Sequence, residues 1–270
     1  PENARLEDRG ITGQLYGGDN DMRLRQEIVL GIGGMRALEA LNYKPTVFHM
    51  NEGHSAFLAL ERIRLFIERQ GLRFEEALEA TRVNNVFTTH TPVEAGHDRF
   101  SSELMNYDLQ RYLASLNVPF KEILALGRVK PEDEHELFCM TVLALKLCRA
   151  ANAVSELHGQ VSRHMWQSLY NVPEDKVPIG HITNGIHLLG WMKGSVRQFW
   201  RKKLTDATNG EAKFFQEKFG SDWSSAINHT EFWEKMTDPN FVTDEELWAL
   251  RYKLRRELID HDVKRVRRDG

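Results

Sequence analysis

The sequence has little of what would indicate several common classes of protein. Only two cysteines occur among 270 residues, Cys139 and Cys148, and their spacing fits neither a redox Cys-x-x-Cys pair nor a zinc site. We expect both to be buried, reduced side chains of a cytoplasmic protein. The formal net charge is only −3, which favours neither nucleic acid nor an anionic membrane as a partner.

Long hydrophobic runs are also missing. No stretch reaches the ~20 apolar residues that a transmembrane helix needs, and no basic and apolar leader opens the chain, so we expect neither a membrane span nor secretion. Apolar residues nevertheless make up 41% of the chain and charged residues 28%, as in a globular protein with a real core. The chain opens on Pro1 rather than Met and ends on a helical pattern, so we expect a piece of a longer polypeptide.

Apolar periodicity predicts strands that alternate with helices. The four strand-like runs are residues 46–50, 84–89, 152–155 and 178–183. We interpret the nearly continuous apolar stretch at 137–151 as one buried helix. Because the intervals between strands are too long for hairpins, they imply right-handed parallel crossovers. The fold class is therefore α/β, a Rossmann-like parallel sheet with flanking helices.

The character of the chain changes after the last strand-like run. Helical patterns rich in Trp, Phe and Lys follow, without a convincing strand, over residues 191–204, 210–220 and 232–236. A capping box at Thr243–Glu246 then opens a helix that runs to about residue 266. We place a boundary near 184–190, which separates a Rossmann-like domain, residues 1–186, from an all-helical segment, residues 187–270. In a truncated chain this segment should expose some of its tryptophans, Trp191, Trp200, Trp223 and Trp233.

Three of the strand-like runs end in side chains that can bind a polyhydroxylated ligand. Asn51-Glu52-Gly53-His54 follows the first run, His90-Thr91-Pro92 the second and Thr183-Asn184-Gly185 the last. Because ligands of an open parallel sheet bind beyond the carboxyl ends of its strands, we expect the three clusters to share one site. Asn, Glu, His and Thr offer donors and acceptors to sugar hydroxyls, and Gly53 would leave room for a ligand between its neighbours.

Each cluster taken alone has an ordinary structural explanation. Asn184-Gly185 is a common turn dipeptide, His90 could be a half-buried histidine, and Asn51 could cap a helix. Only their coincidence at strand ends favours binding. A metal site is not expected, because no His pair has the helical spacing with an intervening Glu of a zinc protease. Gly31–Gly34 follows a helical pattern rather than a strand, so we expect close helix packing instead of dinucleotide binding.

Six short motifs occur in an order that is recognisable. They are Leu15-Tyr16, Arg23–Glu27, Asn51–His54, Thr89–Thr91, Leu157–Gly159 and Thr183–Ile186. Together they resemble the glycogen and α-glucan (maltodextrin) phosphorylases, most of all their shorter bacterial branch. The resemblance covers nearly the whole chain to about residue 200 and continues more loosely beyond it.

The resemblance implies a two-domain retaining glycosyltransferase with its active site between Rossmann-like halves. Such phosphorylases use inorganic phosphate to release glucose 1-phosphate from the non-reducing end of an α-1,4-glucan, with pyridoxal phosphate as an acid/base partner. Residues 1–186 would be the later part of the glucan-binding N-terminal domain, and residues 187–270 the helical start of the cofactor domain. The lysine that binds pyridoxal phosphate would lie outside this chain, so the chain alone would be inactive. A homodimer is one option for the full-length protein.

By the same resemblance, His90 and Asn184 would hold hydroxyls of the transferred glucosyl unit. Glu52, His54 and Thr91 would lie beside that subsite. These five residues are our predicted substrate-binding set.

Two departures from the family pattern limit what can be transferred. Thr12-Gly13-Gln14 stands where larger phosphorylases carry an Arg before the Leu-Tyr pair, and His187–Gly190 stands where Pro-Arg-Arg often follows Asn-Gly. Neither segment receives a role. Two alternatives stay open: a glycogen or starch synthase that uses a nucleotide-sugar donor, and a non-catalytic glucan-binding remnant. A pyridoxal-lysine region in the parent sequence beyond Gly270 would favour the phosphorylase.

Overall fold

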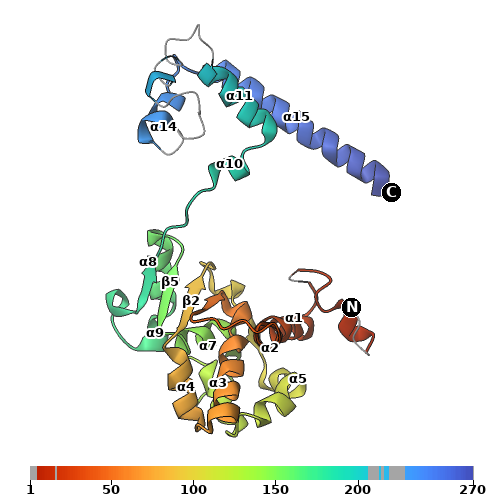
Figure 1. Ribbon diagram of the computed structural model, residues 1–270, viewed down its shortest axis with the longest axis vertical. Helices are drawn as coiled ribbons and strands as arrows, with labels where there is room; N and C mark the ends of the chain where they lie inside the picture. The colour runs from red at the N-terminus through yellow and green to blue at the C-terminus, as the bar shows by residue number, and fades with distance from the viewer. Residues whose placement is uncertain (1–4, 16, 206–212, 214–215, 219–228, 270) are drawn as a thin grey trace. The chain divides into compact units, whose positions relative to one another are not determined.

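The computed structural model describes residues 5–15, 17–205, 213, 216–218 and 229–269. The chain divides into two compact units between Asn184 and Gly185 (Figure 1). In the described part of the chain, no helix is both long and apolar enough to cross a membrane.

The first unit alternates strands with helices, as the sequence pattern predicts. Its elements are, in chain order, η1 (Glu7–Gly10), α1 (Asn20–Ile28), η2 (Val29–Gly33), α2 (Gly34–Ala40), β1 (Phe48–Asn51), η3 (Gly53–Ser55), α3 (Phe57–Gln70), α4 (Phe74–Arg82), β2 (Asn85–Thr89), η4 (Glu94–Gly96), β3 (Arg99–Phe100), α5 (Ser102–Ala114), α6 (Phe120–Leu126), β4 (Phe138–Cys139), α7 (Met140–Lys146), β5 (Ala150–Ala153), α8 (Glu156–Met165), α9 (Gln167–Tyr170), η5 (Glu174–Lys176) and β6 (Ile179–His181).

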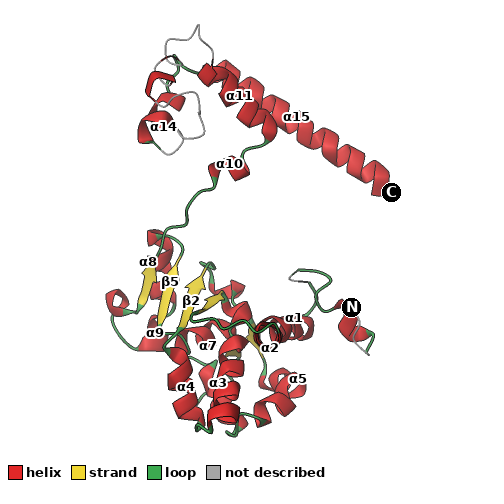
Figure 2. Cartoon of the chain, viewed as in Figure 1, coloured by secondary structure: helices red, strands yellow, loops and turns green. Residues whose placement is uncertain are grey.

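Four parallel strands form the central sheet in the order β1-β2-β5-β6 (Figure 2). In the register, Phe48 lies opposite Asn85, and Val86 lies opposite Ala150. Because all four strands run the same way, their carboxyl ends meet at one edge, where the predicted binding clusters follow. The α/β parallel sheet with flanking helices is therefore confirmed.

The interpretation of residues 137–151 as one helix is wrong at both ends. Phe138–Cys139 forms β4, which pairs antiparallel with β3, and Ala150–Ala153 forms β5. Only Met140–Lys146 is helical. Both residues of β4 are buried, and a strand buried on both faces has no apolar alternation, so it cannot be told from a buried helix by periodicity.

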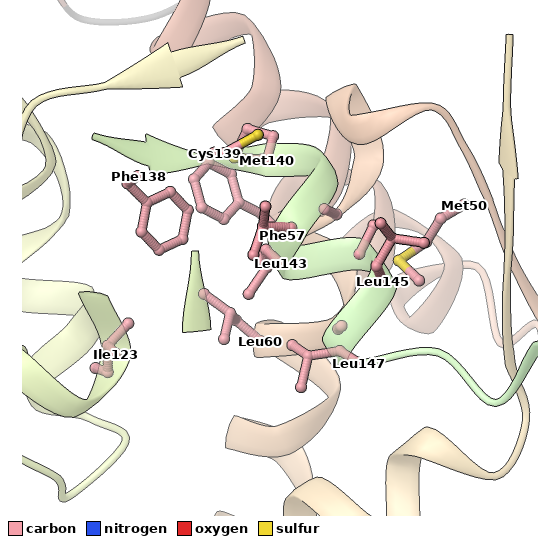
Figure 3. Packing of buried hydrophobic residues seen from close by; sticks show 14 of the residues in the cluster. Met50, Phe57, Leu60, Ile123, Phe138, Cys139, Met140, Leu143, Leu145 and Leu147 are labelled. Carbon is pink, nitrogen blue, oxygen red and sulfur yellow. The ribbon is translucent and has the colours of Figure 1, made fainter. Parts of the chain in front are cut away.

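The core of this unit forms around α3 and α7 (Figure 3). Phe57 and Leu60 on α3 are fully buried, as are Met140 to Ala144 of α7 almost without exception. The rings of Phe57 and Phe138 stack with centroids 6.3 Å apart. Both cysteines are buried and free, as expected from their apolar surroundings.

Helix packing explains the first glycine of the Gly31–Gly34 run. A Cβ placed on Gly31 would lie 2.8 Å from the backbone nitrogen of Leu58 and 2.8 Å from the Cβ of Phe57. The π-helical segment η2 therefore packs directly on α3, and close helix packing is confirmed at this position. At Gly34, in contrast, a Cβ would meet nothing within 4 Å.

The second unit is helical in its described residues: α10 (Leu188–Trp191), α11 (Gly194–Thr205), α14 (Thr230–Met236) and α15 (Asp244–Asp269). The predicted capping box opens α15, since the backbone nitrogens of Thr243 and Glu246 donate to each other's side chains at 3.1 and 3.3 Å. Trp191 is 85% exposed, whereas Trp200 packs on a small buried cluster. Trp223 and most of the helix predicted at 210–220 lie outside the described residues.

Candidate functional site

A cavity of about 440 Å³ opens beyond the carboxyl ends of β1 and β2. We call it the strand-end pocket, and its lining residues are Arg23, Asn51, Glu52, His54, His90, Thr91, Gly96 and Asp98. Four of the five residues predicted to bind substrate therefore line one cavity. They reach it because the segments that follow parallel strands leave the sheet at the same edge.

Asn184, the fifth predicted residue, does not line this cavity. It follows β6, two strands away from β2, and its backbone N–H donates to the carbonyl of Val154 at 3.0 Å. Because neighbouring strands lie ~4.8 Å apart, the ends of β2 and β6 are separated by roughly 10 Å. The structure thus places Asn184 at the same edge of the sheet, with an exposed side chain outside the pocket wall.

Glu52 joins the ends of two strands. Its side chain is buried, and Oε1 accepts hydrogen bonds from the backbone N–H of His90 and, at 3.4 Å, from the hydroxyl of Thr89. The backbone at Glu52 has φ 65° and ψ 172°, a region adopted almost only by glycine. Strain of this kind at a pocket wall persists only where surrounding contacts enforce it.

The account of Gly53 as a space for ligand is wrong. Gly53 is buried, and a Cβ there would lie 3.0 Å from the Cβ of Met140 and 3.1 Å from the backbone nitrogen of Thr141. The glycine is therefore needed because η3 packs tightly against α7. This contact fixes the turn that carries Glu52 and His54.

His90 is held at both its backbone and its ring. Glu52 binds the backbone N–H, and the ring Nε2 lies 2.5 Å from Oδ1 of Asn51. Since an amide oxygen can only accept, Nε2 carries the proton in this arrangement. Next to it, a Cβ on Gly96 would lie 2.6 Å from the methyl carbon of Thr91, so the loop closes on that side chain. The result is a wall of fixed donors and acceptors.

A second group of side chains meets at His54. The Nη2 atom of Arg23 lies 2.8 Å from Oδ2 of Asp98, 3.1 Å from Oε1 of Glu27 and 3.3 Å from Nδ1 of His54. His54 Nδ1 is itself 3.1 Å from Oδ2 of Asp98. Sequence reasoning missed the part played by Arg23, Glu27 and Asp98. Arg23 and Glu27 lie one helical turn apart within the Arg23–Glu27 motif, but no local sequence pattern connects them to Asp98.

These contacts change the protonation of three groups. Burial raises the pKa of Glu27 to about 7, and the hydrogen bond to His54 opposes this shift. The hydrogen bonds to Asp98 and Glu27 raise the pKa of His54 to about 9. Burial opposes ionisation of Asp98, but hydrogen bonds from His54 and Arg23 outweigh it and hold its pKa well below the usual range. At neutral pH His54 is thus a cation paired with an anionic Asp98.

Glu27, His54 and Asp98 also place their ligand atoms within 4.8 Å of one another, a spacing that could suit a metal ion. The guanidinium of Arg23 already contacts all three. A metal ion would have to displace that cation and remove the proton from His54 Nδ1. We therefore interpret the group as an ion-pair network.

The sequence matches the carbohydrate phosphorylase family over residues 26–265. It is 38% identical over 268 residues to the maltodextrin phosphorylase of Thermococcus litoralis, covering 99% of this chain and 29% of that protein. It is 38% identical over 283 residues to the glycogen phosphorylase of Mycobacterium tuberculosis, with coverage of 99% and 29%. The glycogen phosphorylase of Aquifex aeolicus is 32% identical, with coverage of 96% and 34%. The chain therefore spans about a third of the length of these relatives.

Proposed function

Because the chain belongs to the carbohydrate phosphorylase family, we propose that its parent protein releases glucose 1-phosphate from the non-reducing end of an α-1,4-glucan. Inorganic phosphate is the acceptor and anomeric configuration is retained. Within the parent, residues 1–186 form the later part of the glucan-binding domain and residues 187–270 the helical start of the cofactor domain. The location is cytoplasmic.

The observation that carries the proposal is the strand-end pocket. Its wall offers hydroxyl, amide, imidazole and carboxylate groups from Thr91, Asn51, His90 and Glu52, a set that matches the alternating donors and acceptors of a sugar ring. Asn51, Glu52 and His90 are held by hydrogen bonds to one another. Such preorganised contacts orient a substrate without a further entropic cost.

We assign distinct tasks to the residues of this wall. His90 and Thr91 hold hydroxyls of the glucosyl unit, and Asn184 reaches the same unit from the end of β6, two strands away from β2. Glu52 fixes the position of His90 by accepting its backbone N–H. His54 lies beside the subsite. A fixed polar wall of this kind favours the charge distribution that develops at the anomeric carbon during transfer.

Pyridoxal phosphate is the cofactor of this family. A Schiff base needs a lysine amine at the site, and no lysine lines the strand-end pocket. The half-buried Lys146 donates to the carbonyls of Ala125 and Arg128 at 2.7 and 2.6 Å, which commits it to joining α6 and α7. We propose that the cofactor lysine belongs to the rest of the parent protein and that this chain alone is inactive.

The test measures glucose 1-phosphate formed by the full-length parent from maltoheptaose and phosphate. We expect His90→Ala and Asn184→Ala to lower kcat/KM by about 100-fold, because each loses a positioned hydrogen bond at the reacting sugar. Glu94→Gln is the matched control, since Glu94 is 75% exposed and pairs only with Arg99 among the contacts described. Consumption of ADP-glucose without phosphorolysis would instead identify a synthase. If the protein catalyses neither reaction, the remaining interpretation is a non-catalytic glucan-binding remnant.

A further inference from the structure

We propose that Asp98, with Arg23 and Glu27, forms a positioning network that fixes the ring orientation and the protonation of His54 at the wall of the strand-end pocket. Asp98 is not among the five predicted substrate-binding residues, and its contact with Arg23 of α1 was not predicted either. The inference rests on the proposed function for its meaning, because it assigns the network to the sugar subsite. The effect of the network on His54 can be measured without any enzymatic activity.

Three separate parts of the first unit converge on this network. Arg23 and Glu27 come from α1, His54 from η3, and Asp98 from the segment between η4 and β3, 44 residues beyond His54. The backbone of Asp98 is fixed as well, since its carbonyl accepts from the N–H of Met140 at 3.1 Å. Helix α7 therefore anchors both Asp98 and, through Gly53, the turn that carries His54.

A single carboxylate oxygen decides the state of the ring. Oδ2 of Asp98 lies 2.8 Å from Nη2 of Arg23 and 3.1 Å from Nδ1 of His54, so two donors converge on it. A neutral ring with an unprotonated Nδ1 would take the hydrogen bond of Arg23 and leave Asp98 with one donor fewer. The anionic oxygen thus favours a proton on Nδ1, and this proton fixes the direction of the ring plane.

Glu27 is the buried member of the network and does not line the pocket. Its side chain is 1% exposed, Oε1 lies 3.1 Å from Arg23 and 3.6 Å from Nδ1 of His54, and Oε2 finds no hydrogen-bond partner in the described part of the chain. A buried carboxylate with one unsatisfied oxygen gains from protonation. Glu27 therefore adjusts the charge behind His54 as pH changes.

The described groups around His54 are engaged by other partners or belong to the network itself. The charged or titratable side chains that contact His54 or share its pocket are Arg23 and Glu27 on α1, Glu52 after β1, His90 after β2 and Asp98 before β3, and His97 is next to Asp98 in the chain. The carboxylate of Glu52 is engaged by the backbone of His90 and by Thr89. The ring of His97 hydrogen-bonds Thr141 through Nδ1 at 2.9 Å. Among the contacts that the structure describes, Asp98 and Glu27 are the acceptors for His54.

The experiment is an NMR titration of ¹⁵N-histidine in the 270-residue chain, with the His54 signals assigned by their loss in His54→Gln. We expect a titration midpoint near 9 in the original chain and a fall of about two units in Asp98→Asn, together with a changed ring tautomer. Glu94→Gln removes a carboxylate four residues away and should leave the midpoint in place. An unchanged midpoint in a folded Asp98→Asn variant would overturn the proposal.

Glu27→Gln keeps the shape of the helix side chain and serves if Asp98→Asn fails to fold. It should lower the His54 midpoint by about one unit, and no change there would equally overturn the network.

The link to sugar binding is tested in the full-length parent with maltopentaose. Asp98→Asn should weaken binding by about 10-fold at pH 7, and this effect should nearly vanish in a His54→Gln background, because Asp98 acts through His54. Equal losses in both backgrounds would give Asp98 a merely structural role. Absence of any maltopentaose binding by the unaltered parent would instead refute the proposed function, while the His54 midpoints would still decide the network.

Discussion

The two compact units differ in how they bury their apolar side chains. In the first unit one continuous core joins α3, α7 and the sheet, and it encloses rings such as Phe57 and Phe138. In the second, the described residues bury a small cluster around Phe232 and Phe241, whereas the 26-residue α15 leaves Trp248 67% exposed.

This difference indicates where a binding geometry can be fixed. A site needs side chains that are locked by packing beneath them, and every residue of the strand-end pocket belongs to the first unit. Helices gain most of their stability from packing an apolar face. The described part of the second unit buries few side chains of α15. The first unit should therefore respond more strongly to core substitutions than α15 responds to surface ones.

The largest effect is expected from Phe57→Ala. This side chain is fully buried and stacks on Phe138, so its removal should cost about 3–5 kcal/mol of the free energy of unfolding. Hydrogen exchange measured by mass spectrometry should show faster exchange in α3 and α7. Phe232→Ala is the control in the other unit and should leave these two helices unchanged; equal acceleration by both variants would mean that the units unfold together.

A pair of glycines separated by one turn should respond in opposite directions. Gly31→Ala drives a Cβ to within 2.8 Å of Phe57 and the α3 backbone, and such overpacking costs about 1–3 kcal/mol. Gly34→Ala meets nothing within 4 Å and should stabilise the helix by up to about 1 kcal/mol. Urea unfolding midpoints of the two variants give the comparison, and similar midpoints would show that η2 does not press on α3.

Stability of the first unit should fall by about 2 kcal/mol as pH rises from about 6.5 to 9. The pKa of His54 is raised to about 9 in the folded chain, so its contribution is complete below the unfolded value of about 6.5 and is lost as pH rises through 9. The raised pKa of Glu27 adds a loss at lower pH, from about 4.5 to 7. Urea unfolding at pH 6.5 and 9 measures the change, and His54→Gln should flatten it.

The smallest effect is expected on α15. Trp248→Gln replaces an exposed ring on a long helix, and surface substitutions of this kind change stability by about 0.5 kcal/mol or less. Thermal unfolding followed by circular dichroism is sufficient. A loss of several kcal/mol would show that this ring is buried in solution and would remove the contrast between the units.

Much of the fold could be predicted because it depends on local pattern. Turn signals and apolar runs placed all four strands of the sheet within a few residues, and the length of the connections required them to be parallel. The failure at residues 137–151 has a physical cause: the side chains of Phe138 to Leu145 are all buried, so neither a period of two nor a period of 3.6 is visible there.

The site was predictable only where topology determines it. His90 and Glu52 could be placed together because the ends of parallel strands share an edge. The inward turn of Glu52 toward a backbone N–H, and the meeting of Asp98 with Arg23, depend on contacts between residues 38 and 75 positions apart. Such contacts follow from tertiary packing, which a single sequence does not display.

The backbone at Glu52 carries an evolutionary consequence. Glycine adopts φ 65° at no steric cost, so Glu52→Gly would relieve strain while deleting the carboxylate that secures His90. Directed evolution for heat tolerance alone should enrich glycine codons at this position, and lineages screened for turnover should purge them. The residue found at position 52 would then differ between the two selections, and its identity would report the trade-off between thermal stability and activity.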